Sequence, residues 1–134
     1  MKKLDFSKYN WEKRTILIVE DTETSNEYFK AAFKNTYVNI YWAKNGLQAV
    51  EMAQEHNDID AIIMDVNLPK MNGIEATKRI KIFKPDVPII VQTAYLHSNE
   101  EEYSKEAGCD EFITKPIKLT LLFAVLDKYL KRLN

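Results

Sequence analysis

Short apolar runs that alternate with segments of helical spacing constrain the fold of this chain more than any other feature. The runs are rich in β-branched and aromatic residues, and they occupy residues 15–19, 37–42, 60–64, 89–92 and 111–114. Amphipathic segments follow them, at residues 22–34, 47–56, 74–83, 98–108 and 118–133. This alternation is typical of a parallel sheet with helices on both faces. We therefore predict a doubly wound α/β domain with five parallel strands, because crossovers between parallel strands are right-handed.

The composition fits one ordinary domain, since the chain has 134 residues of which 46% are hydrophobic. Its net charge of −1 argues against nucleic acid or an anionic membrane surface as a direct partner. No apolar run approaches the roughly 20 residues of a membrane span, and the N-terminus lacks the apolar core of a secretory signal. With a single cysteine, Cys109, these features predict a cytoplasmic setting. We predict that residues 1–14 form a lead or linker and that residues 15–134 form the domain.

Polar side chains follow four of the five predicted strands. They are Glu20 and Asp21 after the first strand, Asp65 after the third, Thr93 after the fourth and Lys115 after the fifth. The carboxyl ends of parallel strands share one edge, where ligands of doubly wound sheets bind. Three carboxylates at one edge would raise each other's pKa values unless a cation lies among them. Mg²⁺ prefers oxygen ligands and uses few carboxylates, so the pattern predicts a Mg²⁺ site open to a phosphoryl group, with Asp65 as candidate nucleophile.

These residues also resemble the receiver domain of the response-regulator family of two-component systems. The resemblance is carried by Glu20 and Asp21 after ILIV, Asp65 within IIMDVNLPKMNG, Thr93 after PIIVQ, and Lys115 after DEFIT. It extends over residues 15–133 and implies a flavodoxin-like (βα)5 fold with strand order 2-1-3-4-5.

The resemblance implies a role for each of these residues. Asp65 would accept the phosphoryl group from the phosphohistidine of a histidine kinase or a histidine phosphotransfer protein. Asp21 and Asp65 would bind Mg²⁺, or Mn²⁺, directly, with the backbone carbonyl of Asn67 as a further ligand. Glu20 would act through water, and Lys115 would contact Asp65 before phosphorylation. The domain would then hydrolyse its own acyl phosphate slowly.

The resemblance further implies a switch. Thr93 would move toward the phosphoryl group while Phe112, at the aromatic switch position, rotates inward. Asn67 and Tyr95 occupy positions that tune the lifetime of the phosphoryl group. The peptide bond between Lys115 and Pro116 would be cis.

Ordinary structural roles for these residues, and other functions for the chain, remain as alternatives. Glu20 and Asp21 could be a helix N-cap and a first-turn acid, and Asp65 could be a turn residue. A phosphatase of the haloacid dehalogenase type would need an acid two residues after its nucleophile, where this chain has Asn67. An FMN-binding flavodoxin-like module would need phosphate donors after the first strand, where this chain has two acids. A pseudo-receiver would lack an acid or the lysine.

The last amphipathic segment predicts both core and surface. Its apolar stripe consists of Leu119, Leu122, Val125, Leu126, Tyr129 and Leu133. Leu121, Phe123 and Leu130 lie outside this stripe and suggest a homodimer or output surface. Two contexts fit such a domain: a free-standing regulator, and the C-terminal receiver of a hybrid sensor kinase. In the second context the domain would belong to the cytoplasmic part of that kinase. The aromatic lead before the first strand favours the second context.

Overall fold

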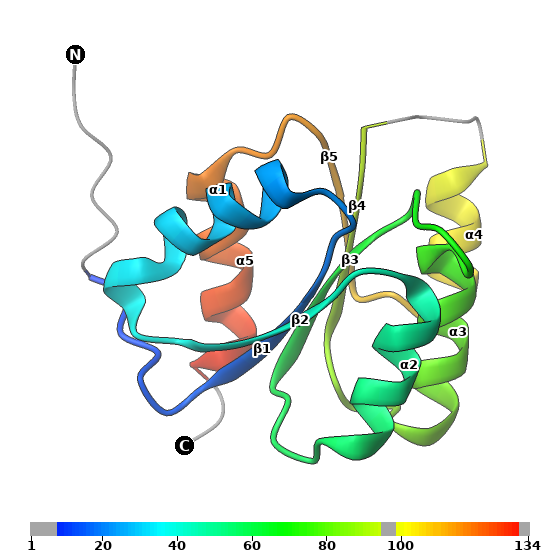
Figure 1. Ribbon diagram of the computed structural model, residues 1–134, viewed down its shortest axis with the longest axis horizontal. Helices are drawn as coiled ribbons and strands as arrows, with labels where there is room; N and C mark the ends of the chain where they lie inside the picture. The colour runs from blue at the N-terminus through cyan, green and yellow to red at the C-terminus, as the bar shows by residue number, and fades with distance from the viewer. Residues whose placement is uncertain (1–7, 95–98, 132–134) are drawn as a thin grey trace.

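The computed structural model describes residues 8–94 and 99–131 and forms one parallel sheet in the order β2-β1-β3-β4-β5. The strands are β1 (Thr15–Val19), β2 (Asn39–Ala43), β3 (Ala61–Asp65), β4 (Ile89–Thr93) and β5 (Glu111–Thr114). The helices are α1 (Glu23–Phe33), α2 (Gly46–Glu55), α3 (Gly73–Phe83), α4 (Glu100–Glu106) and α5 (Leu119–Leu130), with a short 3₁₀ helix η1 (Lys34–Thr36). Helices α1 and α5 cover one face of the sheet, and α2, α3 and α4 cover the other (Figure 1). The predicted fold class and strand order are confirmed.

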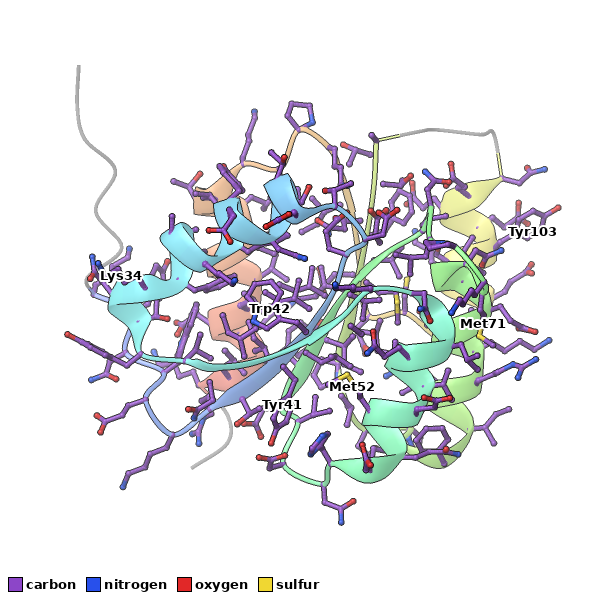
Figure 2. The ribbon with its side chains drawn as sticks, in the orientation of Figure 1. Lys34, Tyr41, Trp42, Met52, Met71 and Tyr103 are labelled. Atoms are coloured by element: carbon purple, nitrogen blue, oxygen red, sulfur yellow. The ribbon has the colours of Figure 1, made fainter. Side chains whose placement is uncertain are left out.

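The three central strands are buried along their whole length because helices cover both of their faces. Their register brings the strand ends to one edge of the sheet. Val19 pairs with Met64, and Asp65 pairs with Gln92, so the residue after Val19 lies level with Asp65. On the face covered by α2 and α3, side chains including Met52 and Met71 pack against this core (Figure 2). No helix of the described residues is both long and apolar enough to cross a membrane.

The N-terminal segment of residues 8–14 packs against the face formed by α1 and α5. Trp11 is only 3% exposed, and its ring centroid lies 5.4 Å from that of Phe123. Its indole N–H donates to Asp127 Oδ1 at 3.2 Å, and Arg14 Nε donates to the carbonyl oxygen of Leu130 at 2.9 Å. This part of the predicted lead therefore closes one end of the core.

This packing corrects the prediction for the last helix. Phe123 and Leu130 were placed outside the buried stripe, but both are buried. The buried face of α5 is wider than its apolar stripe because Phe33 of α1 stacks on Phe123 at 4.9 Å and Trp11 lies 5.4 Å from the same ring. Leu121 stays exposed, as predicted, and Leu133 lies outside the described residues.

Two element boundaries differ from the prediction for local reasons. The second strand begins at Asn39, because Tyr37 ends η1 in a left-handed conformation with φ of 62° that no strand can contain. Helix α4 begins at Glu100 with Asn99 at its N-cap, later than the predicted start at residue 98, which lies outside the described residues.

Candidate functional site

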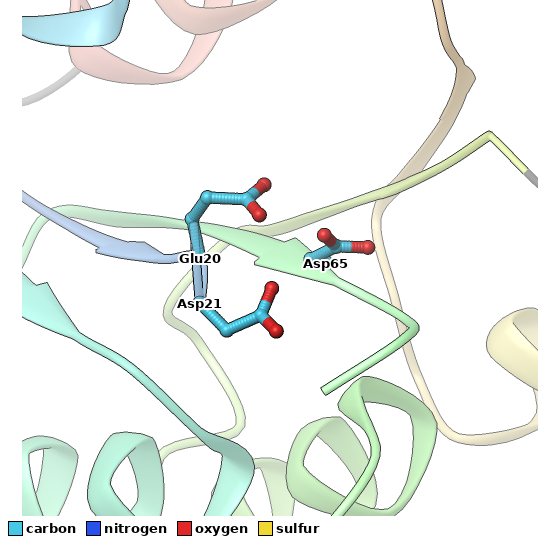
Figure 3. A group of neighbouring side chains, drawn as sticks. All are labelled: Glu20, Asp21 and Asp65. Carbon is cyan, nitrogen blue, oxygen red and sulfur yellow. The ribbon is translucent and has the colours of Figure 1, made fainter. Parts of the chain in front are cut away.

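Three carboxylates meet at the carboxyl edge of the sheet. Glu20 and Asp21 follow β1, and Asp65 ends β3 (Figure 3). One oxygen from each carboxylate lies within 4.8 Å of the others. Glu20 and Asp65 are buried, at 1% and 4% exposure, whereas Asp21 is exposed. The structure thus brings together the three acids that the sequence placed at neighbouring strand ends.

The acid pair does not serve the following helix. Thr22 is the N-cap of α1, and its hydroxyl oxygen accepts a hydrogen bond from Ser25 N at 3.3 Å. The first-turn acid of α1 is Glu23. The interpretation of Glu20 and Asp21 as a cap and a first-turn acid is therefore wrong, and their carboxylates belong to the strand-end cluster.

Lys115 joins two of these carboxylates. Its ammonium lies 3.1 Å from Asp65 Oδ2 and 3.3 Å from Glu20 Oε2. The backbone N–H of Lys115 donates to the carbonyl of Thr93 at 2.8 Å, which fixes the residue beside β4, and the Lys115–Pro116 peptide bond is cis. Burial lowers the pKa of the ammonium, but the carboxylates of Asp65 and Glu20 outweigh this effect and hold the pKa above its ordinary value.

The ammonium of Lys115 carries too little positive charge to neutralise the three carboxylates of the cluster. Burial, and then repulsion from Asp65, raise the pKa of Glu20 from 4.5 to about 7, against the opposing effect of Lys115. The clustered donors are carboxylate oxygens, which suit hard divalent cations such as Mg²⁺. Because Asp21 is exposed, the cluster is open toward solvent on one side. The residues present therefore fit a divalent cation with further ligand positions free.

Hydrogen bonds hold both oxygens of Asp65. Asn67 N donates to Oδ1 at 3.2 Å, which is an Asx-turn contact, and Lys115 holds Oδ2. The turn interpretation of Asp65 is thus confirmed, and the same carboxylate also lies in the acid cluster. The following loop folds back tightly, since a Cβ on Gly73 would lie 1.9 Å from the Asp65 carbonyl oxygen. Only glycine permits this approach of α3 to the end of β3.

The predicted switch residues lie in the two strands that follow β3 in the sheet, Thr93 in β4 and Phe112 in β5. Thr93 is fully buried at the end of β4, and its hydroxyl donates to Glu100 Oε1 in α4 at 3.2 Å. Phe112, in β5, is partly buried against the core on the face of α2 and α3. Tyr95 lies outside the described residues.

Sequence reasoning missed two polar residues at this site. Gln92 is 1% exposed, and its Nε2 lies 3.5 Å from Glu20 Oε2, while its Oε1 is buried with no hydrogen-bond partner among the described residues. An amide inside the apolar run IIVQT was the available signal. Glu100 is 6% exposed, and its side chain accepts a hydrogen bond from Thr93. No local pattern marks that contact.

Known proteins resemble this chain in sequence and in fold. A model of the family described as "Response regulator receiver domain" matches residues 16–127. The polar-differentiation response regulator DivK of Brucella anthropi is 32% identical over 119 residues, which cover 87% of this chain and 96% of DivK.

Solved structures agree with the sequence matches. The receiver domain of the sensor histidine kinase PA1611 from Pseudomonas aeruginosa is 30% identical with a TM-score of 0.80, covering 88% of this chain and 98% of that one. Its structure holds a magnesium ion coordinated in the active-site cleft. The receiver domain of Ssk1 from Saccharomyces cerevisiae is 28% identical with a TM-score of 0.79, covering 87% of this chain and 88% of that one. It was solved together with the histidine phosphotransfer protein Ypd1.

The family match decides among the functions that the sequence left open. It supports neither a phosphatase of the haloacid dehalogenase type nor an FMN-binding module. The five-stranded parallel sheet in the order β2-β1-β3-β4-β5 agrees with the matched family. The chain belongs to the response regulator receiver domain family.

Proposed function

We propose that Asp65 is the residue on which this receiver domain accepts a phosphoryl group. One observation carries the proposal: Lys115 contacts Asp65 at 3.1 Å inside a cluster of three carboxylates whose oxygens lie within 4.8 Å. The donor is the phosphohistidine of a histidine kinase or a histidine phosphotransfer protein. The Ssk1 receiver, solved with a phosphotransfer protein, supports this class of partner.

The residues around Asp65 suit a displacement at phosphorus. A carboxylate oxygen of Asp65 forms the new P–O bond, the P–N bond to the donor imidazole breaks, and the imidazole leaves with the electron pair. Asn67 N and the Lys115 ammonium hold the carboxylate in place before attack. Negative charge remains on the phosphoryl oxygens. Lys115 then contacts one of these oxygens, and the Thr93 hydroxyl donates a hydrogen bond to another.

The acids around Asp65 hold the cation that this chemistry uses. Asp21, Asp65 and the backbone carbonyl of Asn67 would hold the cation directly, and Glu20 would hold it through water. Mg²⁺, or Mn²⁺ in the same donor set, supplies positive charge to the phosphoryl oxygens when bound. The raised pKa of Glu20 and the magnesium-bound PA1611 receiver both support this assignment.

The phosphorylated domain acts as a switch. Thr93 and Phe112 change position together, and the acyl phosphate hydrolyses slowly at a rate tuned by Asn67 and Tyr95. The outer side of α5, where Leu121 is 49% exposed, forms the contact of a homodimer.

Phosphorylation from a small donor tests the proposal directly. We expect acetyl phosphate with Mg²⁺ to add one phosphoryl group to the wild type, detected by mass spectrometry of the intact protein. Asp65→Asn should gain none, and a chelator should abolish the gain in the wild type. Asp86→Asn is the matched control, because it removes an exposed acid from the loop before β4. Equal phosphorylation of the Asp65→Asn protein would refute the assignment.

A further inference from the structure

A buried hydrogen bond connects the end of β4 to the start of α4. Thr93 Oγ1 donates to Glu100 Oε1 at 3.2 Å, and the two residues are 0% and 6% exposed. Glu100 is the first residue of α4, and the chain between the two residues contains the undescribed residues 95–98. The hydrogen bond therefore links strand and helix directly, across the intervening loop.

We infer that Glu100 is a positioning residue that accepts the hydrogen bond of the Thr93 hydroxyl in the unphosphorylated protein. Loss of this hydrogen bond is then coupled to a change in α4. This inference rests on the proposed roles of Asp65 and Thr93. The hydrogen bond from Thr93 to Glu100, called the latch below, must break before Thr93 contacts the phosphoryl group.

The chemistry of the hydroxyl group makes the two contacts of Thr93 exclusive. A threonine hydroxyl has one proton to donate, and a carboxylate only accepts. Thr93 therefore cannot donate to Glu100 and to a phosphoryl oxygen on Asp65 at the same time. Because both residues are buried, loss of this hydrogen bond between them is unfavourable.

Loss of the hydrogen bond from Thr93 affects α4, because Glu100 is the first residue of that helix. Tyr103 N donates to the carbonyl of Asn99 at 2.9 Å and closes the first turn around Glu100. A cavity of about 430 Å³ lies beside Glu100, and the other side of it is the loop that follows Asp65. The lining residues are Val66, Asn67, Leu68, Asn72, Ile74 and Glu100. Once Thr93 turns away, Glu100 has room to change its position, and the first turn of α4 changes with it.

The helix dipole does not by itself explain the burial of Glu100. Acids in the first turn of a helix are favoured there while remaining in solvent. Glu101 and Glu102 stand in the same turn and are exposed. Glu100 differs from them in its burial and in its contact with Thr93. Glu102→Ala is therefore a matched control that removes a first-turn acid without touching the latch.

Binding of beryllofluoride with saturating Mg²⁺ to the full chain, measured by calorimetry, tests the inference. We expect Glu100→Ala to tighten binding about tenfold, because the free protein no longer retains the Thr93 proton. Glu100→Gln keeps an acceptor oxygen and should stay within about threefold of the wild type. Glu102→Ala should stay within about twofold. In a Thr93→Val background, Glu100→Ala should change the affinity by less than about twofold, because the latch acts through that hydroxyl.

A second measurement needs no variant and so does not depend on the folding of Glu100→Ala. Beryllofluoride should accelerate hydrogen exchange of the Tyr103 amide in the wild type by about threefold or more, as the first turn of α4 loosens. Unchanged exchange there, or unchanged affinity of Glu100→Ala, overturns the inference. An effect of Glu100→Ala that persists without the Thr93 hydroxyl also overturns it. Failure of the wild type to bind beryllofluoride would instead refute the proposed function, and the inference with it.

Discussion

The protonation of Glu20 should control the stability of the cation-free protein. In the folded state the pKa of Glu20 is raised from 4.5 to about 7, first by burial and then by Asp65. The folded state thus binds the Glu20 proton more tightly than the unfolded state does. The stabilisation from this proton is fully present below about pH 4.5, and it is lost as the pH rises through about 7.

The size of the effect follows from the two pKa values. The difference between 4.5 and about 7 corresponds to about 3 kcal/mol of unfolding free energy, as an upper value for one group. Glu20→Gln imitates the protonated acid at every pH. We expect the variant and the wild type to be about equally stable near about pH 3, and the variant to be more stable by up to about 3 kcal/mol near about pH 8.

Urea unfolding followed by tryptophan fluorescence measures this difference, because Trp11 is buried in the core. The difference between the variant and the wild type cancels the other groups that titrate. Glu51→Gln, on the exposed side of α2, is the control and should run parallel to the wild type. Mg²⁺ at about 100 times its dissociation constant should restore about 2.7 kcal/mol to the wild type at high pH. Parallel curves of Glu20→Gln and the wild type from acid to alkaline pH would refute the argument.

Two further predictions concern packing. Trp11→Ala should lower the unfolding free energy by about 3–5 kcal/mol in urea unfolding, because the ring is buried against α5, whereas Tyr28→Ala, at a half-exposed ring, should cost far less; a loss below about 1 kcal/mol for Trp11→Ala would show that residues 8–14 are a loose linker. Gly73→Ala should destabilise the domain by about 1–3 kcal/mol or more, because its Cβ would meet the Asp65 carbonyl oxygen at 1.9 Å, and an unchanged melting temperature would contradict this close approach.

Much of the site could be predicted because the period of the strands and the position of a residue along them are local properties. Glu20, Asp65 and Lys115 each follow an apolar run, and parallel strands must present such residues at one edge. The roles of Gln92 and Glu100 could not be found in this way. Gln92 contacts Glu20 from far along the chain, and Glu100 contacts Thr93 only because the chain folds back between β4 and α4. An amide or an acid in isolation has many ordinary uses.

The last helix shows the same division. Its apolar spacing predicted a buried face correctly, but the width of that face depended on Trp11, which approaches from the other end of the chain.

The linear pattern of apolar runs and strand-end polar residues was sufficient for the fold class and the acid cluster, because backbone geometry dictates them, whereas the strand order followed only from the family resemblance. The pairing of one threonine proton with one buried glutamate, the width of the α5 core face and the raised pKa of Glu20 emerged only in three dimensions. Burial and electrostatic repulsion depend on which distant side chains come together, and no local pattern encodes those distances.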